Sequence, residues 1–213
     1  VFEVGMDKKG EIDMLTKIIK PDVGVITNIS YAHAKNFKNL KQIALAKSEI
    51  INNIVDGGSI VLNADDKFYK FHRNIALKKK LKIYSFSTNK KTATVSLISI
   101  KKEKSKFKVF IKIDNQKKYF LISSNFENNL KNLLAAIAVI SIYKDIKNLN
   151  KNIFYNYQVP YGRGDFSRIK INKKSILLID ESYNSNPLSL KSSINNFDLI
   201  DSKKNKKHII LGD

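Results

Sequence analysis

The chain has 213 residues and 43% hydrophobic content, enough for one large domain or for one domain joined to part of another. It carries 39 basic and 19 acidic residues, a formal charge of +20, and no cysteine, which excludes disulfides, thiolate metal sites and a cysteine nucleophile. No apolar run approaches the roughly 18 to 20 residues that a membrane span requires. The lack of cysteine fits a reducing compartment, so we expect a cytoplasmic protein. The sequence opens inside an apolar stretch without Met, and we expect a fragment of a longer protein.

The positive charge comes almost entirely from lysine, since the chain has only three arginines. A basic surface can bind nucleic acid by releasing counterions from the phosphate backbone. Here the lysines are scattered over predicted helices and hairpins instead of forming a stripe. We therefore expect a solvated surface and no nucleic-acid partner, and keep a basic, non-catalytic nucleic-acid-binding module as the alternative from a different class.

The first part of the chain alternates strand and helix patterns. Short runs rich in β-branched residues at 1–4 and 22–28 flank a segment with helical spacing. A second helix is expected at 39–54 and a third strand from residue 59. This alternation predicts an α/β fold with a mostly parallel central sheet flanked by helices, in which ligands bind where the strands end.

The rest of the chain mixes hairpins and helices. Period-two alternation over 81–123 predicts an antiparallel β-hairpin section, and an apolar helix is expected at about 126–146. A hairpin at 166–179, a helix at 188–200 and a last strand at 208–211 then indicate the start of a second α/β unit. A breaker cluster of Pro, Gly and Gly at 160, 162 and 164 separates the two parts, so we expect domains at 1–159 and 160–213.

Three residues break the expected patterns. Glu3 lies in a predicted strand, where it either forms a salt bridge at the strand end or binds a metal or phosphate site. Lys47 falls on the apolar stripe of its helix, where it either extends its head to solvent or is desolvated, with a lowered pKa and a usable neutral amine. His33, just after a strand, is either a packed or surface histidine or a ligand.

Further polar residues lie at helix and strand ends. Asn129 and Asn132 share one face of an apolar helix and can either cap the core edge or hydrogen-bond one planar group. Asp180 ends an apolar strand, the usual position of ligand contacts in an α/β sheet. The loop after it forms either a simple turn or part of a binding site, with Tyr183, Asn184 and Asn186.

Seven motifs follow one another in the order found in the Mur ligase family. They read EVGM with GEI, PDVGVITNISYAH, IALAKSEI, VLNADD, NNLKNLLAAIA, YGRG and IDESYNSNP, and they cover essentially the whole chain. The chain therefore resembles this family. DESYNSNP is most similar to the branch that adds D-alanyl-D-alanine, because the ligases that add the third residue more typically carry a DYAHTP-like loop.

The resemblance implies a central ATP-binding domain and a Rossmann-like C-terminal ligase domain. It implies a monomeric, ATP- and Mg²⁺-dependent amide ligase of peptidoglycan precursor synthesis. The γ-phosphate of ATP would move to the terminal carboxylate of UDP-N-acetylmuramoyl-tripeptide, and the amine of D-alanyl-D-alanine would attack the acyl phosphate. Positioning of the substrates and neutralisation of the transferring phosphoryl group are the physical requirements of this reaction.

The resemblance also implies roles for individual residues. In the metal site, Glu3 would bind one Mg²⁺, and His33 a second one beside Lys47, which is carbamylated in this family. The expected nucleotide contacts are the adenine for Asn132 and its neighbour Asn129, the phosphates for Arg163, and the ribose hydroxyls for Asp180. The residues expected near the peptide substrates are Thr27, Asn28, Tyr183, Asn184 and Asn186.

Two departures from the family pattern stand out. Asn128 occupies the place where the family often has a histidine, so the aromatic contact expected there is missing. The eight glycines include no G-x-x-x-x-G-K-[ST] phosphate loop, which in the family lies upstream of EVGM. We therefore expect the fragment to be inactive alone. Another Mur ligase or a folylpolyglutamate synthase-like ligase remains the alternative within the enzyme class.

Overall fold

The computed structural model describes residues 1–31, 36–103, 106–123, 129–157, 160–172, 174–183, 187–200 and 206–212. They belong to two compact units, Val1–Val159 and Pro160–Asp213. The assignment of these units to an ATP-binding and a ligase domain stays a prediction. No helix in the described part of the chain is long and apolar enough to span a membrane.

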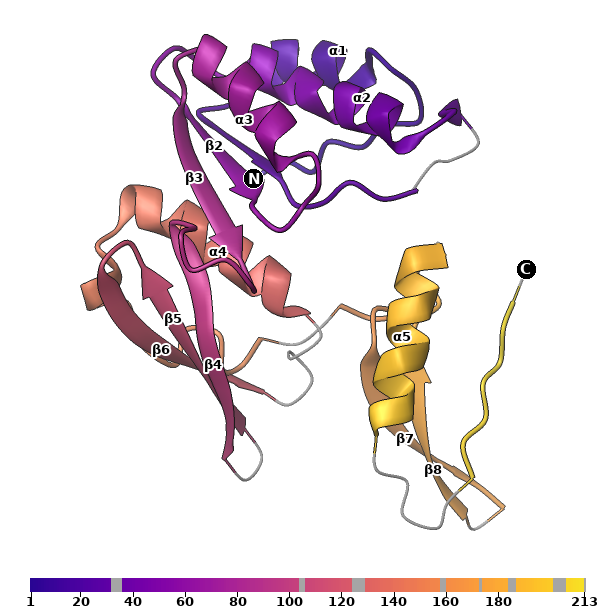
Figure 1. The fold of residues 1–213 in the computed structure, drawn as a ribbon. Coiled ribbons are helices and arrows are strands. Elements are labelled where there is room, and N and C mark those ends of the chain that lie inside the picture. The colour runs from indigo at the N-terminus through magenta and orange to yellow at the C-terminus, as the bar shows by residue number, and fades with distance from the viewer. Residues whose placement is uncertain are drawn as a thin grey trace. The chain divides into compact units, whose positions relative to one another are not determined.

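The first unit is an α/β layer structure (Figure 1). Its helices are α1 (Glu11–Ile19), α2 (Leu40–Asn52), α3 (Tyr69–Lys78), α4 (Leu130–Tyr143) and the short 3-10 helix η3 (Ile146–Asn148). Its strands are β1 (Val23–Ile26), β2 (Ser59–Asn63), β3 (Lys82–Ser87), β4 (Val95–Glu103), β5 (Lys106–Ile113) and β6 (Gln116–Ser123). They form one sheet in sequence order, parallel from β1 to β4 and antiparallel from β4 to β6. The expected α/β class with a mostly parallel sheet and an antiparallel section is confirmed.

Strand β2 is buried along its whole length because helices cover both faces of the sheet. Val61 belongs to the core formed with α4 and the antiparallel strands. Ile60 and Leu62, which alternate with it, belong to the core on the opposite face, with residues of α2 and α3. Burial on both faces explains why the three residues between Ser59 and Asn63, the two ends of the strand, are all apolar.

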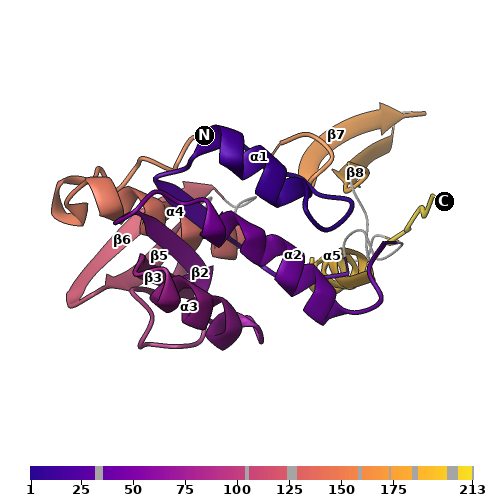
Figure 2. The same ribbon diagram turned by 90° about the horizontal axis from the view of Figure 1, so that it is seen from above.

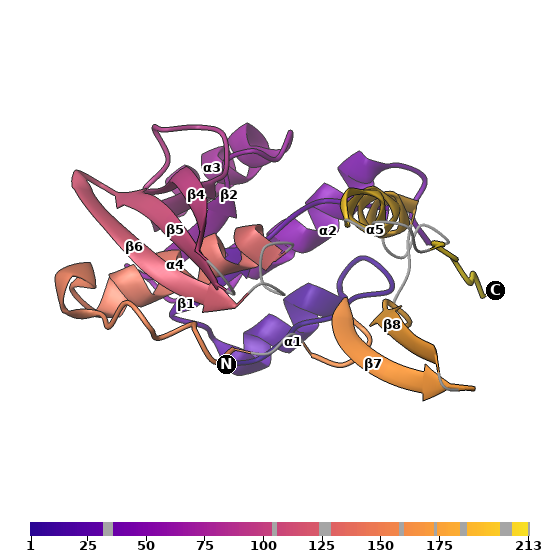
Figure 3. The same cartoon turned by 90° about the horizontal axis from the view of Figure 1, so that it is seen from below.

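Helix α1 packs on α2 through apolar and polar contacts (Figures 2 and 3). The Glu49 carboxylate, 8% exposed on α2, accepts hydrogen bonds from the backbone N–H groups of Gly10 and Asp13 at 2.9 to 3.2 Å. The Glu49 side chain, which belongs to α2, therefore caps the first turn of α1. The macrodipole of α1 favours an anion at this N-terminal end. One turn later, the Asn53 amide donates to Asp13 and to the Thr16 hydroxyl.

Three of the expected elements differ in the structure. Residues 1–6 form no strand, and the six-stranded sheet of the described residues begins at β1. The segment at 208–211 is likewise not a strand, and Ile210 is 94% exposed. Strand β3 is parallel to β2 instead of antiparallel, because the unpredicted helix α3 forms a crossover connection between them.

The second unit consists of a hairpin and a helix. Strands β7 (Asp165–Ile171) and β8 (Lys174–Asp180) pair in an antiparallel register from Asp165–Asp180 to Ile171–Lys174. Helix α5 spans Pro187–Leu199, so the expected hairpin and helix are confirmed. Proline at the first helical position fits the start of α5, since its backbone lacks an N–H that a helix start would leave unpaired.

Replacing Glu49 with Ala should destabilise the 213-residue chain by about 2 kcal/mol, because the partly buried hydrogen bonds at the start of α1 lose their acceptor. Urea unfolding followed by circular dichroism measures the change. Glu49→Gln, which keeps an amide oxygen, should lose less. Glu103→Ala, which breaks the exposed ion pair with Lys108, should leave the stability nearly unchanged. An equal effect of all three substitutions would contradict the capping role.

Candidate functional site

The carboxyl ends of β1, β2 and β3 meet at one edge of the sheet, and polar side chains fasten them together. The Asn63 amide, at the end of β2, donates to the Thr27 carbonyl just after β1 at 2.9 Å. The amide oxygen of Asn63 also accepts from the backbone N–H of Asp65 at 2.9 Å. Asn63 therefore fixes both its own turn and the neighbouring strand end.

The next peptide group of the β1 end is held from both sides. The Lys47 ammonium on α2 donates to the Asn28 carbonyl at 3.1 Å. The N–H of the same peptide group, that of Ile29, donates to Asp66 Oδ2 at 2.8 Å. A cation from α2 and an anion from the turn after β2 thus clamp the peptide unit between Asn28 and Ile29, which restrains the backbone at the end of β1.

Lys47 lies on the predicted apolar face of α2, as expected, and is half-buried. Burial lowers the pKa of its ammonium below 10.5, and the nearby Asp66 carboxylate raises it in part. A lowered pKa increases the fraction of neutral amine at a given pH. The structure therefore favours the desolvated alternative for Lys47 over a freely solvated head group.

Asp65 links the ends of β2 and β3. Its carboxylate accepts from the Ser87 hydroxyl at 2.5 Å and from the Thr88 N–H and hydroxyl at 2.8 and 2.9 Å. Burial raises the pKa of Asp65, but these hydrogen bonds outweigh it, so the pKa lies below its usual value. Lys131 of α4 adds a smaller electrostatic contribution in the same direction, which places the first turn of α4 near the same edge.

The first turn of α4 presents the two predicted amide side chains. Asn132 donates to Asn129 Oδ1 at 3.3 Å, so the two side chains act as a pair on one face, as their spacing predicted. Leu133 and Leu134 behind them are buried in the core and hold the turn in place. Amide groups of this kind offer donors and acceptors to a planar base such as adenine, so these residues fit a nucleotide.

The described residues do not assemble a Mg²⁺ site. Glu3 lies on the irregular segment before α1 and is exposed, and His33 lies outside the described residues. Among the described residues, no group of three or more His, Asp or Glu side chains could hold a metal ion. As an ammonium, Lys47 is a hydrogen-bond donor and not a ligand, so its predicted metal role depends on chemical modification.

The second unit contains the remaining predicted nucleotide contacts. Asp180 ends β8 as expected, and its carboxylate accepts from Ser182 N at 2.9 Å. Hydrogen bonds from Ser182, and a weaker one from Tyr161, lower the pKa of Asp180, which keeps it anionic. The guanidinium of Arg163 lies over the Tyr183 ring, 4.3 Å from its centroid. Asn184 and Asn186 lie outside the described residues.

Comparison with known proteins identifies the family of this site. The model of the Mur ligase middle domain matches residues 1–140. The chain belongs to the Mur ligase family. The end of β1, Lys47 and the asparagine pair all fall inside the matched residues, so this site belongs to the middle domain of the family.

The relatives of this Mur ligase chain include D-alanyl-D-alanine ligases. It is 31% identical over 203 residues to the UDP-N-acetylmuramoyl-tripeptide--D-alanyl-D-alanine ligase of Rickettsia prowazekii, covering 91% of this chain and 42% of the relative. It is 28% identical to the ligase of the same name from Bacillus subtilis, over all of this chain and 44% of the relative. A crystal structure of MurF from Acinetobacter baumannii superposes with a TM-score of 0.80 at 27% identity, over 94% of this chain and 42% of that one. The chain thus spans less than half the length of these relatives.

Sequence reasoning missed four residues at the Mur ligase strand edge. Asn63, Asp65 and Asp66 were part of the VLNADD motif but were given no role, and His72 had no distinguishing context. The sequence feature that could have revealed the first three is the run of polar residues directly after a strand that is buried on both faces. Ligand-binding residues, and the residues that hold them in place, occur at such strand ends. His72 gave no signal, because its burial depends on the packing of α3 against α2.

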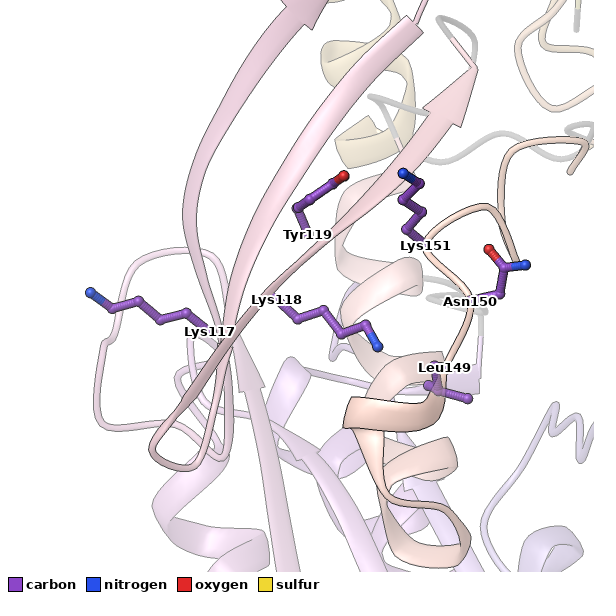
Figure 4. A pocket seen from close by; sticks show the side chains of 6 residues that line it. All are labelled: Lys117, Lys118, Tyr119, Leu149, Asn150 and Lys151. Carbon is purple, nitrogen blue, oxygen red and sulfur yellow. The ribbon is translucent and has the colours of Figure 1, made fainter.

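A shallow cavity of about 500 Å³ at the edge of β6 is not part of this site. None of the predicted site residues lines it, and its lining includes Lys117, Lys118 and Lys151. Lys118 donates to the carbonyls of Ile146 and Lys147, and Lys117 points away from the other two lysines (Figure 4). The three cations therefore do not converge on one anion.

His72 of this Mur ligase chain should make it sensitive to acid. Its imidazole is 2% exposed, and Nε2 lies 3.0 Å from the Ala44 carbonyl. Burial lowers the pKa of His72 below 6.5; the Ala44 carbonyl and Asp66 oppose this shift, and Lys47 adds to it. Between the pKa of His72 in the folded state and 6.5, the unfolded state binds more protons than the folded state. The contribution of His72 to the free energy of unfolding is therefore fully present above pH 6.5 and is lost as the pH falls through this window.

His72→Gln should remove this acid-dependent loss of unfolding free energy. Urea unfolding of the chain between pH 7 and pH 5 measures it, and the exposed His208 supplies a matched control, since His208→Gln should keep it. If His72→Gln and the unchanged protein lose the same stability on acidification, the buried imidazole is not the cause.

Proposed function

We propose that the full-length protein containing this chain is an ATP-dependent ligase that joins D-alanyl-D-alanine to UDP-N-acetylmuramoyl-tripeptide. The observation that carries the proposal is the convergence of the clamped β1 end, the half-buried Lys47 and the β2 end at one sheet edge. The names of the relatives from Rickettsia prowazekii and Bacillus subtilis support the choice of substrates. ATP is supported by a MurF structure from Thermotoga maritima described as a complex with ADP.

In this proposal four side chains contact the nucleotide. Asn129 and Asn132 recognise the adenine, Asp180 accepts hydrogen bonds from the ribose hydroxyls, and Arg163 donates to the phosphates. Each role matches the chemistry of the side chain: amide edges for a base, an anionic acceptor for hydroxyls, and a planar cation for phosphate oxygens. The cation neutralises the charge that spreads over the phosphoryl oxygens during transfer.

Lys47 has the properties that carbamylation requires. The ammonium first loses one proton; the neutral amine then attacks CO₂, an N–C bond forms as one C=O π bond opens onto oxygen, and a second proton leaves the nitrogen, so a cation becomes an anion. Burial, which lowers the pKa of Lys47, supplies the neutral amine. We propose that Glu3 binds one Mg²⁺ and that this carbamate, together with His33, holds a second one, since the preferred ligands of Mg²⁺ include carboxylate oxygens.

We propose that Thr27 and Asn28, at the end of β1, contact the peptide substrates, and that Asn184 and Asn186, in the loop after β8, do so as well. We further propose a monomeric enzyme in the cytoplasm, where ATP is available.

A folylpolyglutamate synthase from Lactobacillus casei shares the fold, with a TM-score of 0.67, but at 17% identity that likeness extends to the fold alone. The DESYNSNP loop and the names of the relatives favour the D-alanyl-D-alanine ligases, and no site described above favours a nucleic-acid-binding module.

Incubating the full-length protein with ATP, Mg²⁺, UDP-N-acetylmuramoyl-tripeptide and D-alanyl-D-alanine should release ADP and form the extended peptide. ADP release in a coupled assay and mass spectrometry of the product measure the reaction. A panel of single amino acids in place of the dipeptide should give little turnover. Turnover with glutamate, or none with the dipeptide, would contradict the assignment.

Replacing Lys47 with Ala in the full-length protein should reduce kcat at least about a hundredfold, because the cluster would lose the anion that neutralises metal charge. A short carboxylate such as formate or acetate should restore part of the activity by filling the space with an external anion. Lys47→Arg, which keeps a cation that cannot be carbamylated, should not retain activity. Full activity of either variant without added carboxylate would refute the role of Lys47.

A further inference from the structure

The turn that carries Arg163 is fastened to the segment after β8 by backbone contacts. Gly164 N donates to the Asp180 carbonyl at 2.7 Å, and Tyr183 N donates to the Gly162 carbonyl at 3.0 Å. Both glycines have positive φ, and a Cβ at Gly162 would lie 3.0 Å from Tyr183 Cβ. The backbone of Arg163 and that of Tyr183 are therefore held in a fixed relation to each other.

This arrangement places the two side chains face to face. The Arg163 guanidinium carbon lies 4.3 Å from the centroid of the Tyr183 ring, within the range of a cation–π contact. Within the described residues, no carboxylate forms an ion pair with Arg163. Stacking occupies the flat face of a guanidinium and leaves its N–H groups, which lie in the plane, able to donate to an anion.

We propose that Tyr183 is a positioning residue that orients the Arg163 guanidinium toward the nucleotide phosphates. This inference rests on the proposed function, because it deepens the role of Arg163 in it. It also revises the role expected for Tyr183, whose ring acts through Arg163 rather than by contacting the peptide substrate. An arginine without such support loses the freedom of its long side chain on binding, which weakens binding.

Steady-state kinetics of the full-length protein test the proposal. Tyr183→Leu should lower kcat/KM for ATP about two- to fivefold, the effect of one partly exposed cation–π contact. KM for D-alanyl-D-alanine should stay unchanged. Tyr183→Phe keeps the ring and should behave like the unchanged enzyme. Tyr143→Leu removes a tyrosine of similar exposure, 66% against 65%, at the end of α4 and serves as the matched control.

A double-mutant cycle shows whether Tyr183 acts through Arg163. In the Arg163→Ala background, Tyr183→Leu should have no further effect on kcat/KM for ATP. An effect of the same size in both backgrounds would overturn the proposal. A change in KM for D-alanyl-D-alanine, with ATP kinetics unchanged, would overturn it in favour of a direct peptide contact.

A spectroscopic readout separates this inference from the proposed function. In full-length protein labelled with ¹⁵N- and ¹³C-arginine, the side-chain signals of Arg163, identified by their loss in Arg163→Ala, should show a ring-current shift. The shift should persist in Tyr183→Phe and disappear in Tyr183→Leu. If the protein shows the ring-current shift but does not catalyse ligation, the proposed function is contradicted. If the protein is active but shows no shift, the stacking of Arg163 on Tyr183 is refuted.

Discussion

The strand-end edge depends on one peptide group, the link between Asn28 and Ile29. Its carbonyl accepts from the Lys47 ammonium and its N–H donates to the Asp66 carboxylate. The peptide group thus connects two opposite charges that do not form a direct ion pair among the described contacts. This arrangement satisfies both backbone groups where β1 has ended and can no longer supply ladder partners.

The fold brings these groups together through the order of its layers. Because β1, β2 and β3 are parallel, their carboxyl ends lie at the same edge, and the residues that follow them meet there. Helix α2 returns over the sheet between β1 and β2, which carries Lys47 above the end of β1. Helix α4 covers the opposite face and brings its amide pair to the site region. The chemistry of the site therefore follows from parallel pairing.

Periodicity predicted most elements of the fold, including α2, β2, the antiparallel section and the β7–β8 hairpin. It failed where pairing with another segment decides the outcome. The apolar residues 1–4 form no strand, and β3 is parallel because α3 went unrecognised. Alternation of residues is a local property, whereas the direction of a strand depends on the path of the connection before it.

The sequence by itself determined the family, the asparagine pair that shares one face at the start of α4 and the place of Lys47 on an apolar helix face, because each follows from local order or spacing. Only the tertiary structure decided that Asp66 binds the backbone after β1, that His72 lies against the Ala44 carbonyl, and that Arg163 stacks on the Tyr183 ring. The partners are far apart in the sequence: 37 positions for Asp66 and Ile29, 28 for His72 and Ala44, and 20 for Arg163 and Tyr183. No local pattern encodes such a pairing, since it arises only when packing brings the elements together.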